Sequence, residues 1–211
     1  NIETKPTNIM LKTLLRISLA SIAMAGVAAA GTVTALNFGG DFRQVQAGGN
    51  AVSGGFVAVG TSSLSDAAIS NLTDASVLAN SFTQFGDSTS FGTAAVNNFA
   101  GYFSFTPSGD GGAPAFDGQE IFLIGGNGNS IASSTSLFVV RSNSTFGTDA
   151  PLFSASIGLG DNVLLGANGG SATVGGFPAF QMADVGGIIP EPGVSILALF
   201  SAGLLVLRRR R

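Results

Sequence analysis

The sequence predicts a mainly β protein: a single β-sandwich or jelly-roll-like domain that carries one short helix. Short runs rich in Val, Ile, Leu and Phe alternate with stretches of Gly, Asn and Ser, the pattern of strands joined by turns. No fixed repeat period is visible, which disfavours a β-solenoid. At each end of the chain, an apolar segment predicts a further helix, so that a signal-peptide helix and a C-terminal transmembrane helix flank the domain.

Six segments are typical of strands, and the last two are the weaker candidates: residues 52–60, 99–106, 119–124, 136–141, 162–166 and 173–184. Residues 119–124 (QEIFLI) and 136–141 (SLFVVR) are apolar on both faces, as strands at the centre of a sheet are. Residues 99–106 (FAGYFSFT) alternate, which predicts a half-buried strand with Phe99, Phe103 and Phe105 on one face.

The helical candidate is residues 72–85, where Asp74 can cap the N-terminus and Ala75, Leu78 and Phe82 share one face.

Residues 125–129 (GGNGN) lie between the two central strands and allow two interpretations. Such residues tolerate positive φ, so a tight hairpin turn is one. Extended to residues 125–131 (GGNGNSI), the segment also resembles a single nonapeptide calcium repeat, although Asn129 stands where that repeat has Asp.

Composition excludes several kinds of chemistry. Residues 31–190 carry ten acidic and two basic residues, a formal charge of −8, which argues against binding nucleic acid. The chain contains no His and no Cys, and residues 31–190 contain no Lys, so a Ser nucleophile would lack its usual base. We therefore predict a protein that is not an enzyme, with no catalytic residue, no metal site and no cofactor.

Carboxylate catalysis and sugar binding are the chemical alternatives. Glu120 is the one Glu of residues 31–190, and Asp110 and Asp117 flank a Gly- and Pro-rich loop, but nothing in the sequence places two carboxylates together. Sugar platforms use Trp or Tyr, and this region has no Trp and only Tyr102. We expect its many Phe side chains to form the core.

The N-terminal region has the order of an export signal. We interpret residues 1–9 as an upstream, artefactual segment and Met10 as the start. Lys12 and Arg16 then form a positive n-region, and residues 17–27 form an apolar h-region that is too short to span a membrane.

Ala28 and Ala30 supply the small residues that signal peptidase requires. We expect cleavage after Ala30, with cleavage after Ala35 as the alternative. Residues 10–30 are thus a signal peptide, and residues 31–187 are the exported domain.

The C-terminal region, residues 188–211, has three parts in a fixed order. Pro190, Glu191 and Pro192 come first, and residues 193–207 follow without a charge. A helix of this length spans roughly 22 Å. Four arginines then form a membrane stop signal: Arg208, Arg209, Arg210 and Arg211. The positive-inside rule keeps them in the cytoplasm.

This tripartite end resembles the PEP-CTERM sorting domain of Gram-negative bacteria. The resemblance implies recognition by exosortase, a membrane protease-transpeptidase that cuts near the motif and releases or transfers the protein. Pro190, Glu191 and Pro192 would then be recognition residues of a substrate. A plain C-terminal transmembrane anchor is the alternative.

We therefore expect an exported protein of the cell surface or extracellular matrix, with a structural or interaction role in exopolysaccharide or biofilm. Its expected partners are the Sec translocon, signal peptidase, exosortase and, transiently, the inner membrane; extracellular polysaccharide is a further candidate. The alternative is a ligand-binding module for polysaccharide or Ca²⁺.

Overall fold

The protein is mainly β, as predicted. The computed structural model describes residues 31–37, 43–92, 99–147, 153–174 and 177–186. Its elements in chain order are β1 (Gly31–Leu36), β2 (Val45–Ala47), β3 (Asn50–Ala51), β4 (Gly54–Ser62), α2 (Asp66–Ser70), α3 (Ala75–Ser81), β5 (Phe82–Gln84), β6 (Thr89–Phe91), β7 (Ser104–Phe105), β8 (Ser108–Gly109), β9 (Glu120–Gly126), β10 (Ser136–Thr145), β11 (Ser154–Gly158), β12 (Asn162–Leu165), β13 (Ala167–Val174), β14 (Phe177–Gln181) and β15 (Ala183–Asp184).

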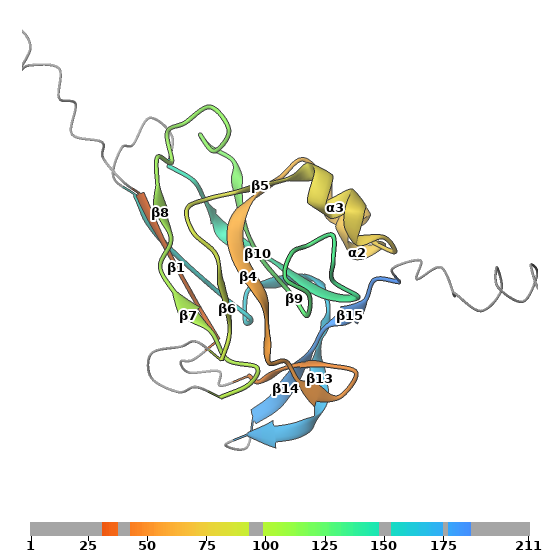
Figure 1. Cartoon of the computed structure of the whole chain (residues 1–211). Coiled ribbons are helices and arrows are strands. Elements are labelled where there is room, and N and C mark those ends of the chain that lie inside the picture. Colours follow the sequence, from red (N-terminus) through yellow and green to blue (C-terminus); the bar gives the residue numbers. More distant parts are fainter. Residues whose placement is uncertain (1–30, 38–42, 93–98, 148–152, 175–176, 187–211) are drawn as a thin grey trace, which may run out of the picture.

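A seven-stranded sheet lies at the centre of the molecule (Figure 1). Its strands follow the order β12-β10-β9-β4-β5, while β15 pairs with β10 and β6 pairs with β4. The central pairs β10–β9 and β9–β4 are antiparallel, with Val139 opposite Ile124 and Ile124 opposite Ala58. The strands predicted at residues 52–60, 119–124, 136–141 and 162–166 are therefore confirmed as β4, β9, β10 and β12, within a few residues at their ends.

Two smaller sheets complete the fold. In one, β1 lies between β11 and β7, with β8 also paired to β1, and the β1–β11 pairing is parallel. The other has the order β13-β14-β2-β3. Figure 1 places β1, β7 and β8 on one side of the seven-stranded sheet and the two helices on the other.

Both faces of the central sheet are buried because its strands alternate between two apolar clusters. On one face, Val59, Leu123 and Phe138 pack with residues of the β1 sheet such as Val33. On the other face, side chains of the same three strands pack beneath the helices; they include Phe56, Ala58, Phe122, Ile124, Leu137 and Val139. The prediction that β9 and β10 are apolar on both faces is therefore confirmed.

The helix prediction is confirmed at its start and wrong at its end. Asp74 caps α3 by accepting a hydrogen bond from the Ser76 N–H (2.8 Å), and Ala75 and Leu78 are buried. The helix ends at Ser81, however, and Phe82 begins β5. The expectation of one helix is also wrong, because α2 precedes α3. With five residues, α2 is too short to produce a helical period in the sequence.

The predicted alternation of residues 99–106 is wrong for most of its length. Only Ser104–Phe105 form a strand, β7. Gly101 has φ of +82°, a left-handed conformation that interrupts an extended strand. Phe99 is 63% exposed, whereas Tyr102, which alternation places on the opposite face from Phe103, is buried as Phe103 is.

Residues 173–184 and 125–129 also differ from expectation. Residues 173–184 are divided among β13, β14 and β15 rather than forming one strand. Gly125 and Gly126 belong to β9, and the connection to β10 is residues 127–135, which is longer than a tight hairpin turn.

Candidate functional site

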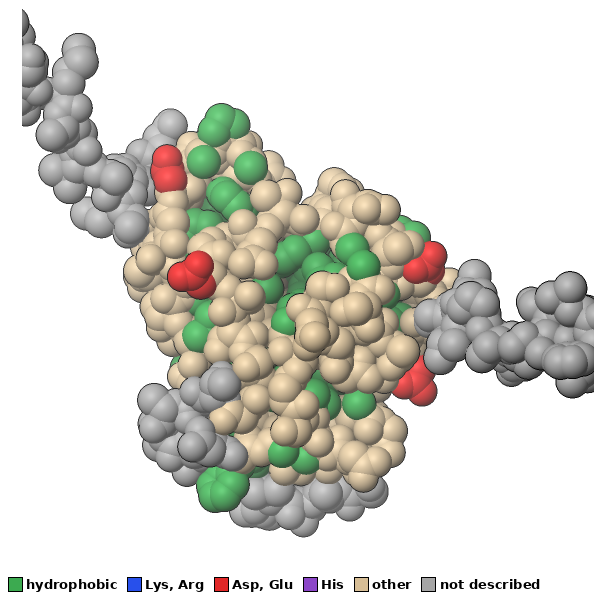
Figure 2. All heavy atoms as spheres, viewed as in Figure 1, with side chains coloured by type: hydrophobic (Ala, Val, Ile, Leu, Met, Phe, Trp, Pro, Cys, Tyr) green, Lys and Arg blue, Asp and Glu red, His purple; other side chains and the backbone are tan. Residues whose placement is uncertain are grey.

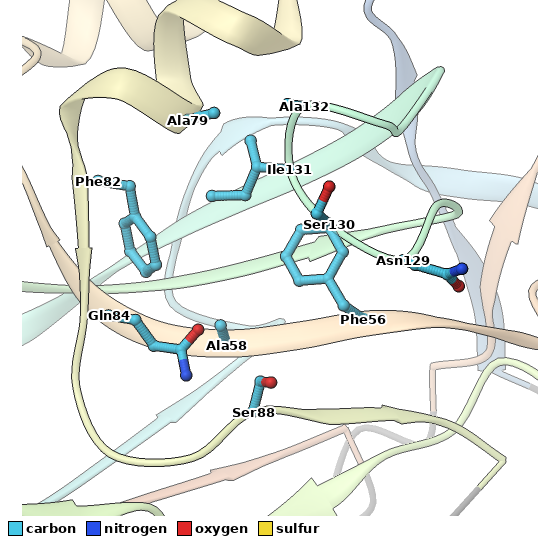
Figure 3. A pocket seen from close by; sticks show the side chains of 10 residues that line it. All are labelled: Phe56, Ala58, Ala79, Phe82, Gln84, Ser88, Asn129, Ser130, Ile131 and Ala132. Atoms are coloured by element: carbon cyan, nitrogen blue, oxygen red, sulfur yellow. The ribbon is translucent and has the colours of Figure 1, made fainter.

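A groove lies beside β4, between α3 and β5 on one side and the loop of residues 127–135 on the other (Figure 3). Its volume is about 310 Å³, at the small end of the range for ligand sites. Figure 2 shows hydrophobic side chains in the middle of this face, below the helices. The lining residues are Phe56, Ala58, Ala79, Phe82, Gln84, Ser88, Asn129, Ser130, Ile131 and Ala132.

The floor of the groove follows from the alternation of β4. Phe56 and Ala58 both face the helical side of the sheet, and the small Ala58 leaves space beside the larger ring. Phe82, the first residue of β5, and Ile131, from the loop, form the walls. Figure 3 shows the side chains of Phe56, Phe82 and Ile131 gathered around one hollow.

The loop of residues 127–135 is held in shape by its own hydrogen bonds. The Asn127 side-chain oxygen accepts the N–H groups of Thr135 and Ser136, each at 3.0 Å. The buried Ser134 hydroxyl accepts the Gly128 N–H at 3.0 Å and donates to the Ser130 carbonyl at 2.8 Å. The wall of the groove is therefore a closed, internally bonded loop.

The rim of the groove is polar and uncharged. Gln84, Ser88, Asn129 and Ser130 are exposed amides and hydroxyls. The Gln84 amide donates one hydrogen bond, to the Gly86 carbonyl at 2.8 Å. None of the ten lining residues titrates, so the groove has the chemistry of a neutral binding surface and not that of an acid–base site.

A second hollow of about 310 Å³ lies near the end of α3. It is more polar, because hydroxyls and amides dominate its walls; the lining residues are Thr61, Ser62, Ser63, Asn80, Ser81, Thr83, Ala115 and Gln119. It also lacks an aromatic face and a carboxylate, so we regard it as the weaker candidate for a binding site.

The structure does bring two carboxylates together, and neither residue lines either hollow. The Arg141 Nη1 atom lies 2.7 Å from the Asp66 carboxylate and 3.1 Å from that of Glu120. This arrangement ties α2 to the start of β9. Because the guanidinium lies between the two acids and the acids are 40% and 51% exposed, they form a surface ion pair and not the shared cleft that glycoside hydrolysis needs.

Of the other two acidic candidates, Asp110 and Asp117, the first has a local structural role. Asp110 accepts the Gly112 N–H at 3.0 Å within its own turn. In the part of the chain that the structure describes, no three acidic side chains come together as a metal site would require. In the 125–129 segment, the Asn127 oxygen that a cation would need already accepts two backbone N–H groups.

Tyr102, the one candidate for a sugar platform, is only 3% exposed, so its ring cannot present a face to a ligand. Burial also raises the pKa of its phenol above the ordinary value. Most described Phe side chains are core residues, as expected, and Phe99 is the exposed exception.

The sequence-predicted sorting residues lie outside the described residues. They are Ala28 and Ala30 at the cleavage site, the motif Pro190, Glu191 and Pro192, and the stop signal Arg208, Arg209, Arg210 and Arg211. Among the residues that the structure describes, no helix has the length and apolar character needed to cross a bilayer.

No family model, curated protein or solved structure matches this chain.

Proposed function

We propose that this is an exported, non-enzymatic protein of the cell surface or extracellular matrix, with a structural or interaction role in exopolysaccharide or biofilm. Signal peptidase cuts it after Ala30, and an exosortase processes it at Pro190, Glu191 and Pro192. The exported domain is a β-sandwich of the central sheet and the β1 sheet, an arrangement supported by the apolar cluster that both sheets share. The observation that supports the proposal is the position of the first and last core residues that the structure describes, relative to the two predicted processing sites.

The N-terminal boundary supports cleavage after Ala30. The first strand, β1, begins at Gly31, and its Val33 and Ala35 side chains are fully buried. Cleavage after Ala35 would remove almost all of this strand, which pairs with neighbours on both of its edges. Cleavage after Ala30 leaves it whole.

The C-terminal boundary supports a separate sorting tail. Val185 is the last core residue that the structure describes, and its N–H donates to the Thr135 carbonyl at 3.0 Å. Pro190 follows five residues later. The motif therefore follows the last described strand in the sequence and interrupts no described strand, which supports a separate role for it.

Mass spectrometry of the envelope-associated protein tests the proposal. The full chain is expressed in a Gram-negative host with an exosortase and in the same host without it. We expect an N-terminus at Gly31 in both, and loss of Arg208, Arg209, Arg210 and Arg211 only with the enzyme. A motif variant, Pro190→Ala with Pro192→Ala, is the matched control. A mature envelope form that retains the four arginines in the presence of exosortase would contradict the processing step.

The groove favours one second candidate, binding of a neutral polysaccharide. The half-buried Phe82 ring in its wall suits the apolar face of a sugar, and its uncharged amides and hydroxyls suit sugar hydroxyls. Affinity electrophoresis with neutral and anionic glycans tests this. We expect Gln84→Ala with Asn129→Ala to weaken retardation by a neutral glycan at least tenfold, while Asn50→Ala, at the exposed start of β3, leaves it unchanged. Equal mobility of all variants with every glycan would refute it.

A further inference from the structure

The sequence contains two Asn-Gly steps, Asn127–Gly128 and Asn168–Gly169. At such a step the backbone nitrogen of the glycine can attack the asparagine side chain, because glycine has no Cβ to block the approach. The nitrogen loses its proton and bonds to the side-chain carbonyl carbon, the bond from that carbon to the amide nitrogen breaks, and ammonia leaves. Water then opens the resulting succinimide ring. The product is Asp or isoaspartate, so one neutral amide becomes one carboxylate.

The fold protects the first of these steps. The Gly128 N–H, whose nitrogen would attack, donates to the hydroxyl of Ser134, a residue that is only 2% exposed. The Asn127 side-chain oxygen accepts the N–H groups of Thr135 and Ser136, and its nitrogen donates to the Thr135 hydroxyl at 2.9 Å. The reaction needs the Gly128 proton to leave and the Asn127 side chain to turn, so it competes with all four hydrogen bonds.

The second step is open. Asn168 and Gly169 are both exposed, and a Cβ added at Gly169 would meet no atom within 4 Å. In β13, Asn168 lies opposite Phe180, and the next paired residue is Gly170, so the ladder passes over Gly169, whose φ is +133°. Within the part of the chain that the structure describes, no hydrogen bond fixes the Asn168 side chain. The two steps therefore have the same chemistry in opposite surroundings.

We propose that Asn168 is a site of spontaneous modification, where the amide is converted to Asp or isoaspartate with water as the co-reactant and without an enzyme. Residues 167–181 carry no charged side chain, so the product adds the first charge to the β13–β14 pair, which Figure 1 places away from the two helices. Isoaspartate also lengthens the backbone by one carbon. The register already shifts at this point, so we expect the domain to stay folded. The inference does not depend on the proposed function.

The first test compares the two asparagines in one protein. The full chain is incubated at neutral and at mildly alkaline pH, and chymotryptic peptides are analysed by mass spectrometry, with isoaspartate methyltransferase labelling to identify the product. We expect Asn168 to react at least tenfold faster than Asn127, because Asn127 reacts only when its loop opens locally. Both rates should rise with pH, since the attacking nitrogen must lose its proton.

Unfolding the protein separates structure from local sequence. In urea both Asn-Gly steps are open, so the two rates should agree within about twofold. Equal rates for Asn168 and Asn127 in the folded protein would overturn the inference. An Asn127 that stays slow in urea would also overturn it, because its protection would then not come from the fold.

The second test changes the protecting groups. Ser134→Ala removes the acceptor of the Gly128 N–H, and we expect it to speed the reaction at Asn127 at least fivefold while leaving Asn168 unchanged. Ser53→Ala, on the exposed segment between β3 and β4, is the matched control and should change neither rate. If thermal unfolding shows that Ser134→Ala is not folded, Thr135→Val replaces it, since that exposed residue loses only the 2.9 Å bond from the Asn127 amide.

The third test isolates Asn168. On isoelectric focusing the unmodified chain should gain one acidic form with time, and Asn168→Gln should not gain it, because a longer side chain forms the ring far more slowly. An acidic form that appears as quickly in Asn168→Gln would overturn the assignment of the site.

Discussion

Asn37 connects the end of β1 to the segment that contains Gly101 through side-chain hydrogen bonds, and its replacement gives a sharp test of the fold. The side chain is only 3% exposed. Its amide nitrogen donates to the carbonyls of Arg43 (2.9 Å) and Gly101 (2.8 Å), and its oxygen accepts the Phe103 N–H (2.8 Å). Asn37→Ala removes all three hydrogen bonds at once.

The loss of the Asn37 side chain has a different energetic cost for each of its three hydrogen-bond partners. The Gly101 carbonyl also accepts the Val45 N–H at 2.9 Å, so it keeps a partner. The Phe103 N–H belongs to a fully buried residue and is left without one, which costs about 1–3 kcal/mol. With about 1 kcal/mol for the other bonds, we expect Asn37→Ala to lower the free energy of unfolding by about 2–4 kcal/mol.

Urea and thermal unfolding of residues 31–186 measure this loss, with the one Tyr as a fluorescence probe in a protein without Trp. At about 2–4 °C per kcal/mol for a domain of this size, Tm should fall by roughly 4–16 °C. The control is Asn50→Ala, whose exposed side chain makes one long hydrogen bond, to Gly48 (3.4 Å). A Tm for Asn37→Ala within 1 °C of the control would refute the reasoning.

Asn37→Asp separates hydrogen bonding from size. A carboxylate can still accept a hydrogen bond from the Phe103 N–H. Its second oxygen, however, would face the two carbonyl oxygens that accept hydrogen bonds from the Asn37 amide nitrogen. The pKa of the new carboxyl should therefore rise above its unfolded value in the folded protein. Its destabilising effect is then largest at neutral pH and shrinks as the pH falls through that raised pKa. A loss of stability that does not change with pH would contradict this account.

Three further predictions concern single side chains. Gly60→Ala would push a methyl group against the Thr83 carbonyl oxygen and should cost about 1–3 kcal/mol in urea unfolding, whereas Gly186→Ala meets open space and should cost less than about 0.5 kcal/mol. The hydrogen bonds from Ser76 hold the pKa of Asp74 below its ordinary value of 3.8, so the Asp74 carboxylate stabilises the fold at neutral pH and loses this effect as the pH falls through the lowered pKa. The difference in Tm between the unmodified protein and Asp74→Ala should therefore close in acid. A difference in Tm that does not depend on pH would contradict this. Burial raises the pKa of Tyr102 above 10.0, so tyrosinate absorbance should appear at higher pH in the folded protein than in urea, and coincident titrations would exclude that cause.

The strands at the centre of the fold could be predicted because their signal is local. Residues 121–124 of β9 and 137–140 of β10 are apolar at four consecutive buried positions, as strands covered on both faces are. The cap at Asp74 was visible for the same reason, since it depends on residues two positions apart. The failure of the alternation predicted for residues 99–106 is also local in origin, because the positive φ at Gly101 interrupts the extended backbone that an alternating strand requires.

The candidate sites could not be predicted, because they depend on distant residues. The groove brings together Phe56, Phe82 and Ile131 from three separate elements, and no spacing in the sequence relates them. The pairing of Arg141 with Asp66 and Glu120 depends in the same way on how α2 lies over the sheet. A sequence pattern reports what a segment buries, but not which segment covers it.

The parallel pairing of β1 with β11 sets the order in which the domain can be completed. The chain is made from its N-terminus, so β1 emerges first, while its partners at Ser104–Phe105 and Ser154–Gly158 emerge much later. At about 5–20 residues per second, the wait is on the order of ten seconds. Both edges of β1 are open to other chains until β7 and β8 emerge, and one edge stays open until β11 emerges. Such long-range closure makes slow, late folding a built-in property of this topology.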